Sequence, residues 1–570
     1  MQTRKICRFV TEVAAPSSVE YVFMVSGGAY MNLSFLKFPV LAALFLSLTS
    51  SHGEADAGSC KDLAGRSFSA LLDAPTQITG TRFVEAADGL PAFCDVIGYT
   101  APQVGLHVRL PKDWNGRFHM EGCGTMCGVR IIENADDPLS RGTAVATTDM
   151  GRSAPLATAE WTGGNPDYNT IMRSGEWAYN NTEQELDFAY RGTHKAVLAS
   201  KAIIAAYYGA DIDHSYWRGC STGGRQGLML AQRYPWHFDG IVAGAPAGIE
   251  PAYINIFWRT LTNLTADGRA ILGQSQIPAV HTEVMAQCDA ADGLKDGVID
   301  DPWACTPDLS VLKCDQPNAE LGRCLSDDQT DVVERLYAGA FLSDGLRVSW
   351  GVPKGGELGL MRYILNEAGE TGTFEPMAQD RLRYTWFDYD PGPTYDAGTF
   401  DLNRDYPRLF TRGLLPAPNN PDLTDFKRRG GKLITYQGLN DMLNAEPLIE
   451  YMKKTERIVG GEEQADEFLR LYLVPGMNHC RGGAGVDTFD WVSEIQTWVE
   501  GGVGPETVIG YRRHGDTSLP GAKAWPLEPV TVLKSRPVYD YPYSARYSGR
   551  GDKTDAASFE AKPLNFSNPL

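Results

Sequence analysis

Short apolar runs alternate with amphipathic stretches between Val104 and Val242, a pattern typical of chains that form an α/β sheet. Glu185–Tyr208 carries apolar residues at helical spacing and gives the clearest helix prediction, with a capping box from Thr182 to Glu185 expected at its start. The runs predicted to be strands are Gly105–Leu110, Arg117–Glu121, Ala144–Thr148, Ser215–Arg218 and Gly240–Ala243.

The pattern changes after Pro246, where loops rich in Gly, Pro and Asp continue until Lys432–Tyr436 and Leu471–Val474 resume the strand signals. We therefore predict an α/β domain in two parts, 58–250 and 431–570, interrupted by a lid domain at 251–430. The tail has one strand-like run at Pro529–Leu533, and we expect the polar sequence after it to be irregular.

The N-terminal residues 1–57 are predicted to lie outside the fold. Met31–Ala57 has the order of a secretory signal: Lys37 closes a short N-terminal region, Phe38–Leu48 is apolar, and Ala55-Asp56-Ala57 suits cleavage. Residues 1–30 precede that internal Met and are interpreted as an over-extended reading frame. The mature chain is expected to start near residue 58, without a membrane span, in the periplasm or the medium.

Composition narrows the class of protein. The 570 residues, 43% of them hydrophobic, can bury a large core and exceed the usual size of one compact domain. A net charge of −19 without a basic run argues against a nucleic-acid partner. Beyond Cys7, the ten remaining cysteines form an even set, which in an exported chain predicts disulfides. Three pairs are close in sequence, namely Cys123 and Cys127, Cys288 and Cys305, and Cys314 and Cys324.

A serine nucleophile is predicted at Ser221. The pentapeptide Gly219-Cys220-Ser221-Thr222-Gly223 fits G-x-S-x-G between a predicted strand and a helix-like stretch, Gly224–Arg233. A sharp strand-to-helix turn needs glycines because the backbone is crowded there, and it exposes the hydroxyl. A plain Gly/Ser turn is the alternative for an isolated pentapeptide.

A serine hydroxyl also needs a base and an acid that orients the base, in the chain order Ser, Asp or Glu, His. Asp441 follows the predicted strand at 432–436, and His479 follows the one at 471–474, so these two complete the predicted triad. Glu446 or Asp487 remain alternatives for the acid, and Asp441 would then cap the next helix. His281 and His514, in the lid and the tail, are expected to be solvated or core side chains.

Two cysteines give a geometric check on this triad, because Cys220 directly precedes Ser221 and Cys480 directly follows His479. A disulfide holds its two Cα atoms about 4.4–6.8 Å apart. A Cys220–Cys480 bridge would therefore make the proposed nucleophile and base neighbours.

The oxyanion of acyl transfer needs two N–H donors. The amide of Thr222 is predicted to supply one. The other is expected in the glycine-bearing loop 122–128 after the second predicted strand, from Gly124 or Thr125, between which the sequence does not choose.

An acidic loop lies in the predicted lid, where carboxylates alternate with turn glycines over residues 288–301 and Cys305 follows. Calcium prefers such oxygen ligands, although the spacing is not that of an EF-hand. From the chemistry alone, a solvated acidic turn is an equal alternative.

In these residues the chain resembles the tannase and feruloyl esterase family, which includes bacterial mono(hydroxyethyl) terephthalate hydrolases. The likeness covers nearly all of the chain after the signal and rests on Gly219–Gly227, on Asp441, on Gly476-Met477-Asn478-His479-Cys480 and on the acidic loop. It implies an α/β-hydrolase fold with a large inserted lid, and a triad bridged by a disulfide.

The resemblance also implies one structural Ca²⁺ in the lid. Its ligands would be the side chains of Asp289, Asp292 and Asp296 and the carbonyls of Leu294 and Val298. The further disulfides it suggests are Cys288–Cys305, Cys60–Cys94 and Cys314–Cys324. Cys123 and Cys127 depart from the plainer glycine-rich loop of the family, and a local Cys123–Cys127 disulfide would stiffen the oxyanion loop.

The expected activity is hydrolysis of an aromatic carboxylic ester through an acyl-enzyme. In the lid stretch 381–389, Arg383, Trp386 and Phe387 are candidates to hold the planar acyl group, with lid core as the alternative for each aromatic. Two rival classes remain: an exported ligand-binding protein on an inactive hydrolase scaffold, and a serine peptidase.

Overall fold

The computed structural model describes residues 57–152, 173–249, 253–265, 269–273, 275–316, 322–363, 375–410, 415–514 and 531–566. All of them belong to one compact unit. The predicted signal segment lies outside these residues except for its last residue, which begins helix α1 (Ala57–Leu63). None of the helices in the described ranges is long and apolar enough to cross a membrane.

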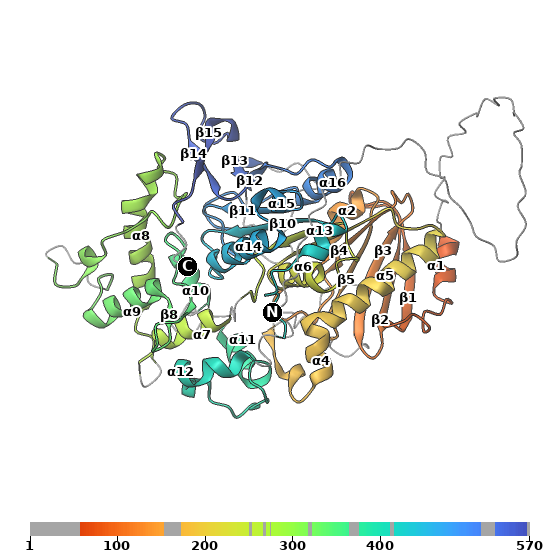
Figure 1. Cartoon of the computed structure of the whole chain (residues 1–570), viewed down its shortest axis with the longest axis horizontal. Helices are drawn as coiled ribbons and strands as arrows, with labels where there is room; N and C mark the ends of the chain where they lie inside the picture. The colour runs from red at the N-terminus through yellow and green to blue at the C-terminus, as the bar shows by residue number, and fades with distance from the viewer. Residues whose placement is uncertain are drawn as a thin grey trace, which may run out of the picture. The chain divides into compact units, whose positions relative to one another are not determined.

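A nine-stranded sheet organises the described chain, in the order β1-β2-β3-β5-β4-β6-β7-β10-β11 (Figure 1). The pairs from β1 to β5 are antiparallel, and the pairs from β5 to β11 are parallel. The strands are β1 (Thr76–Val84), β2 (Phe93–Thr100), β3 (Val104–Pro111), β4 (Arg117–Glu121), β5 (Ala144–Thr148), β6 (His214–Cys220), β7 (Gly240–Gly244), β10 (Lys432–Gly438) and β11 (Leu469–Val474). Each strand predicted in the sheet is present: β4 and β5 have the predicted bounds, and the others differ by at most two residues at an end.

Side chains alternate between the two faces of this sheet. Trp217 and Ile241 lie in the cluster formed with α5, α6 and α14, whereas Tyr216 and Val242 lie in the cluster formed with α16. Both faces are therefore covered, which explains why the parallel strands are apolar nearly throughout. The helices beside the sheet are α2 (Asp136–Ser140), α5 (Gly192–Tyr208), α6 (Thr222–Arg233), α13 (Thr424–Arg428), α14 (Glu446–Val459), α15 (Glu462–Asp466) and α16 (Trp491–Gly501).

The segment between β7 and β10, which was predicted as a lid at 251–430, contributes no strand to the central sheet within its described residues. It has a hydrophobic core of its own, in which the Phe257 and Phe400 rings meet edge to face at 5.3 Å. Its elements are α7 (Tyr253–Thr262), α8 (Gln276–Cys288), α9 (Asp327–Ala338), β8 (Ala340–Phe341), β9 (Arg347–Ser349), α10 (Leu360–Tyr363), α11 (Glu375–Tyr384) and α12 (Leu402–Asp405).

The helix predicted at Glu185–Tyr208 is interrupted. α4 (Thr182–Leu186) is followed by a π-helical turn, Asp187–Arg191, before α5 begins. In this turn the buried Asp187 accepts hydrogen bonds from Arg191 (2.6 Å) and Lys195 (3.2 Å). The spacing of apolar residues, on which the helix prediction rested, does not reveal such buried polar contacts. The predicted capping box is also wrong: Asn181 is the N-cap and accepts from the Gln184 amide, while Thr182 is already helical.

The tail contains more strand than predicted. β12 (Thr507–Arg513) pairs with β13 (Val532–Tyr539), and β14 (Tyr543–Tyr547) pairs with β15 (Phe559–Pro563), so the expectation of irregular polar sequence was wrong. The first residues of the predicted strand 529–533 lie outside the described part of the chain. These pairs bury few apolar side chains, and charged residues interrupt the alternation that would have identified them.

The five predicted disulfides are all present. Their Cα atoms lie 4.9–5.9 Å apart, within the range of unstrained bridges. The pairs are Cys60–Cys94, Cys123–Cys127, Cys220–Cys480, Cys288–Cys305 and Cys314–Cys324.

Candidate active site

Ser221 occupies the single residue between the end of β6 and the start of α6. Its backbone has φ 63° and ψ −119°, a conformation that L-residues rarely adopt. Its N–H donates to the Gly244 carbonyl (2.9 Å), and its carbonyl accepts from the amides of Arg225 and Ala247. The turn is thereby fixed from both sides, as expected of a nucleophile placed at a strand-to-helix turn.

The glycines around Ser221 are required by close contacts. A Cβ on Gly219 would lie 2.6 Å from the Gly223 carbonyl carbon, and one on Gly224 would lie 2.1 Å from the Gly244 oxygen. Both contacts are with backbone, which cannot move aside cheaply. The local sequence around Ser221 therefore determines the turn.

His479 and Asp441 are brought together at the same edge of the sheet. The last residues of β10 and β11, Gly438 and Val474, are register partners, so the loops after the two strands start side by side. His479 Nδ1 lies 2.8 Å from Asp441 Oδ2, and the Asp441 side chain is fully buried while that of His479 is 23% exposed. This geometry leaves Nε2 of His479 as the nitrogen available to a nucleophile.

The alternative acids and histidines have other partners. Glu446 accepts from the Trp303 indole N–H (2.9 Å), and Asp487 accepts from the Gly482 amide (2.8 Å). His281 lies 2.7 Å from a lid carboxylate, that of Glu357. Only Asp441, among the acids considered, contacts His479 in the described chain.

Gln437 is a member of this group that the sequence did not single out. Its buried amide donates to Asp441 Oδ2 (2.7 Å), the oxygen that also contacts His479, while the Leu443 N–H donates to Oδ1 (2.9 Å). Asp441 is therefore held on both oxygens. The one signal in the sequence was its position near the end of the strand that precedes Asp441.

The Cys220–Cys480 disulfide joins the two loops that carry Ser221 and His479. Its Cα atoms are 5.9 Å apart and its cysteines are 260 residues apart in sequence. Each cysteine is the immediate chain neighbour of one proposed catalytic residue, so Ser221 and His479 lie in adjacent loops.

The loop after β4 faces the start of α6. The Cys123 N–H donates to Gln226 Oε1 (3.1 Å), and the Cys127 N–H donates to the Gly124 carbonyl (2.9 Å). These amides are occupied, whereas those of Gly124, Thr125 and Met126 have no hydrogen-bond acceptor in the described chain, so the choice of Gly124 or Thr125 for the oxyanion stays a prediction. The Thr222 hydroxyl donates to the Thr125 carbonyl, and Cys123–Cys127 closes the loop covalently.

Gln226 is a second residue that the sequence did not single out, although it lies within Gly219–Gly227. Its Nε2 donates to Thr193 Oγ1 (2.9 Å) while its Oε1 accepts from Cys123. A buried amide thus ties the proposed oxyanion loop to α5 and α6.

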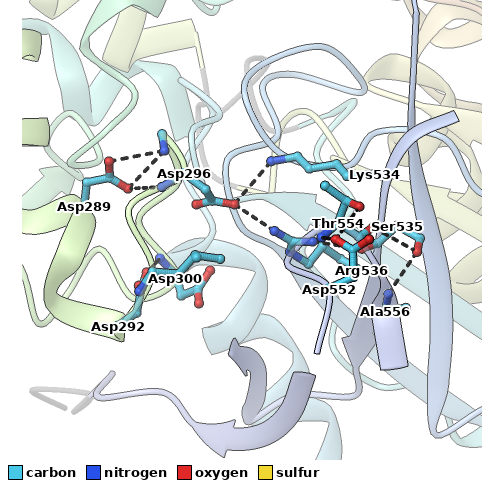
Figure 2. Close-up of polar contacts among 12 residues, drawn as sticks. Asp289, Asp292, Asp296, Asp300, Lys534, Ser535, Arg536, Asp552, Thr554 and Ala556 are labelled. Carbon is cyan, nitrogen blue, oxygen red and sulfur yellow. Dashed lines mark hydrogen bonds and ion pairs between the residues drawn. The ribbon is translucent and has the colours of Figure 1, made fainter. Parts of the chain in front are cut away.

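The acidic loop follows α8 and is drawn in Figure 2. Asp289 Oδ1 accepts from the Gly297 N–H (3.0 Å), and Asp292 Oδ1 accepts from the Leu294 N–H (2.9 Å). Asp296 points the other way, toward the tail, where its Oδ2 contacts Arg536 (2.8 Å) and Lys534 (3.4 Å) of β13 (Figure 2).

The donor set of this loop suits a hard cation, because it consists of carboxylate and backbone carbonyl oxygens. Burial, together with the charges of Asp296 and Asp289, raises the pKa of Asp292 to about 6. Burial and the charge of Asp292 raise the pKa of Asp300, a fourth acid in the loop, well above its usual range. The described residues do not include three His, Cys, Asp or Glu side chains converging on one point. The loop therefore fits Ca²⁺ by charge and donor chemistry, with backbone carbonyls needed as ligands.

The proposed substrate contacts of the lid divide into two kinds. Trp386 and Phe387 are 4% and 1% exposed and belong to the lid core, which favours the core alternative for these rings. Arg383 is half-buried, lies 3.5 Å from Asp380 and donates to the Tyr395 carbonyl. A role of these residues in substrate binding stays a prediction.

Comparison with known proteins places these observations in a family context. The family model described as tannase and feruloyl esterase matches residues 89–562. A mono(2-hydroxyethyl) terephthalate hydrolase of Piscinibacter sakaiensis is 30% identical over 548 residues, which are 83% of this chain and 85% of the relative. A probable feruloyl esterase B-1 of Aspergillus oryzae is 30% identical over 82% of this chain and 84% of its own length.

Solved structures agree with the sequence comparison. The crystal structure of feruloyl esterase B from Aspergillus oryzae superimposes with a TM-score of 0.74 at 26% identity, covering 89% of this chain and all of the other. This likeness confirms the predicted α/β-hydrolase fold.

Proposed function

The chain belongs to the tannase and feruloyl esterase family and is a carboxylic ester hydrolase, and from this premise we propose that it cleaves aromatic esters through Ser221, His479 and Asp441. The observation that carries the proposal is the pair of links at His479. A hydrogen bond joins it to buried Asp441, and a disulfide at the next residue joins its loop to that of Ser221.

The proposed reaction has two halves. His479 Nε2 takes the proton of the Ser221 hydroxyl as its oxygen attacks the ester carbonyl, and Asp441 holds the Nδ1–H so that the imidazole presents the correct nitrogen. His479 then gives the proton to the leaving alcohol, and an acyl-enzyme remains. Water, deprotonated by His479, attacks the acyl group and releases the aromatic acid.

The negative charge on the carbonyl oxygen is proposed to be stabilised by backbone N–H groups. Thr222 supplies one, and Gly124 or Thr125 supplies the other. Gln226 and the Cys123–Cys127 disulfide support this role, because they fix the loop before substrate arrives. A donor that is already oriented does not need to reorganise during the reaction.

A structural Ca²⁺ is proposed in the acidic loop, held by Asp289 and Asp292, by the carbonyls of Leu294 and Val298, and by Asp296 once its carboxylate exchanges its contacts with Arg536 and Lys534 for the cation. When bound, it would neutralise the clustered carboxylates and brace the loop that Cys288–Cys305 closes. No proton transfer in the reaction passes through it.

Export is proposed as well, to the periplasm or the medium. The five disulfides support an oxidising compartment, since such bonds persist outside the cytosol. The predicted signal at 31–57 is the sequence feature behind this proposal.

Substrate class is tested with a panel of methyl esters of hydroxybenzoic and hydroxycinnamic acids, alongside aliphatic esters and peptide amides. The proposal expects turnover of aromatic esters that disappears in Ser221→Ala while the melting temperature is retained. Equal turnover of peptide amides, or no turnover by a folded wild-type protein, would contradict it and favour the peptidase or the non-catalytic binding protein.

A further inference from the structure

A cavity of about 250 Å³ lies between the lid and the residues that flank the Asp441 loop, Leu439, Ala445 and Glu446. It is lined by residues that follow the acidic loop, by α9, by the segment after β8, and by the first residues of α14. None of its lining residues belongs to the Ser221 turn, the His479 loop or the oxyanion loop. A ligand bound here would therefore occupy a second site.

The walls of this cavity are rich in aromatic rings, those of Trp303, Tyr337 and Trp350. The two indoles already pack against one aromatic ring of the chain itself. The ring of Phe566 lies 4.9 Å from that of Trp303 and 6.3 Å from that of Trp350. The surface is thus suited to a planar, apolar group.

Two cations stand over these rings. Arg347 Cζ lies 4.1 Å from the centre of the Trp350 ring, and Lys354 Nζ lies 4.8 Å from that of Tyr337. Neither side chain forms a hydrogen bond or an ion pair with any residue that the structure describes. Lys354 is attracted to the more distant carboxylates of Glu357 and Glu446, but neither cation is neutralised by a direct ion pair in the described chain.

The nearby carboxyl groups are engaged elsewhere. Glu357 accepts from the Tyr337 hydroxyl (2.9 Å) and from the Gly355 amide. Glu446 accepts from the Trp303 indole N–H (2.9 Å). Among the charged residues that line the cavity, the cations Arg347 and Lys354 outnumber the single carboxylate, Glu446, which favours an anionic ligand.

We propose that this cavity binds a planar aromatic carboxylate, with its ring against Trp303 and Trp350 and its carboxylate between Arg347 and Lys354. The choice of acid rests on the proposed function, because the acid released there has both features, an aromatic ring and a negative charge. Cation and ring recognition reinforce each other in this arrangement.

Two hydrogen bonds connect the cavity wall to the loop that carries Asp441, so a bound ligand is expected to affect the active site. The segment that carries Arg347 and Lys354 accepts two hydrogen bonds from the loop around Asp441: Asn444 donates to the Gly351 carbonyl (2.7 Å), and Asn440 donates to the Gly355 carbonyl (2.7 Å). A ligand that moves this segment moves the loop of the proposed acid. The acid is therefore expected to lower kcat in addition to competing at the active site.

The test measures binding of 4-hydroxycinnamate by titration calorimetry to the full chain after Ser221 has been modified with phenylmethylsulfonyl fluoride. One binding site is expected to remain. Lys354→Met and Arg347→Met should each weaken it by about tenfold, as should replacing the ligand by the uncharged 4-hydroxycinnamyl alcohol. Arg335→Met is the matched control, since this cation of α9 pairs with Asp331 and does not line the cavity.

Ester hydrolysis by each unmodified variant, expected at the wild-type rate, shows that it is folded. Absence of binding to the modified enzyme, or equal binding by the wild type and both cavity variants, would overturn the inference. If the sulfonyl fluoride does not react at Ser221, the proposed nucleophile fails instead. The comparison of unmodified wild type with Lys354→Met then still decides whether the cavity binds the acid.

Discussion

At the carboxyl edge of the sheet, each proposed catalytic side chain follows a strand, and the loops are fixed by close backbone contacts and a disulfide. A Cβ on Gly438, for instance, would lie 2.3 Å from the Met477 carbonyl oxygen, so the His479 loop crosses directly over the end of β10. In the lid, the acidic loop is also closed by a disulfide, Cys288–Cys305, but it depends in addition on a distant segment, since Asp296 contacts Arg536 of β13.

This difference suggests that the sheet edge serves the chemical step, whereas the lid serves stability and ligand binding. If the proposed triad is right, loss of residues at the sheet edge should be seen in kcat. Loss of lid residues should be seen in the melting temperature or in ligand binding.

The largest effect is expected from the base and its orienting acid. His479→Ala and Asp441→Asn should each lower kcat by about four orders of magnitude, because the first removes the proton acceptor and the second allows the wrong tautomer. His281→Ala is the matched lid control and should leave kcat unchanged. Steady-state hydrolysis of an aromatic ester measures all three, and a deficit below tenfold for Asp441→Asn would return Glu446 or Asp487 to consideration.

The next largest effect is expected from removal of the Cys220–Cys480 disulfide. Replacing Cys220 and Cys480 together with Ser should lower kcat by about 100-fold at a temperature where the variant is folded, because a misplacement near 1 Å is costly to proton transfer. The double replacement of Cys314 and Cys324 in the lid should lower only the melting temperature. Equal kcat values for the two variants would remove the distinction between sheet edge and lid.

A smaller loss is expected from the buried amides that position the site. Gln437→Leu removes a donor to Asp441 Oδ2, and Gln226→Leu removes the acceptor of the Cys123 amide. Gln437→Leu should lower kcat by about tenfold, since a hydrogen bond to a charged group contributes roughly 1.5–3 kcal/mol, and Gln226→Leu by a smaller factor, since a neutral hydrogen bond contributes roughly 0.5–1.5 kcal/mol. Gln437→Leu should also change the pH profile of kcat/KM, a result that a purely structural role would not give.

Chelation should have the smallest effect on rate. Exhaustive EDTA treatment is expected to lower the melting temperature by about 5 °C, because a cation that binds only the folded state stabilises it by mass action. The kcat of the protein that stays folded should be unchanged. An unaltered melting temperature together with no calcium by elemental analysis would remove the metal from the account.

The sequence predicted best where the requirement is local. The turn at Ser221 needs its glycines because neighbouring backbone lies within 3 Å of where a Cβ would be placed. The pentapeptide and its flanking strand are therefore enough to identify the turn. Cys220 and Cys480 were informative for a related reason, since each is adjacent in sequence to a residue whose place they determine.

The sequence predicted poorly where the role of a side chain depends on a partner that the pattern of hydrophobic and polar residues does not reveal. Nothing in the sequence distinguishes Gln226 and Gln437 from other glutamines, because their roles follow from their hydrogen bonds to Cys123 and Asp441. Trp386 and Phe387 are buried by lid packing that helical spacing does not show. The π-helical turn before α5 depends in the same way on Asp187, whose cationic partners lie one and two turns away.

The central claim is that Ser221 is a nucleophile activated by His479, and covalent labelling tests it most directly. The wild-type protein is treated with a fluorophosphonate, and the adduct is located by peptide mass spectrometry while its rate of formation is followed. The account predicts a single adduct on Ser221, formed about 10³-fold more slowly in His479→Ala and at the wild-type rate in His281→Ala. An adduct on another residue, or an unchanged rate in His479→Ala, would contradict it.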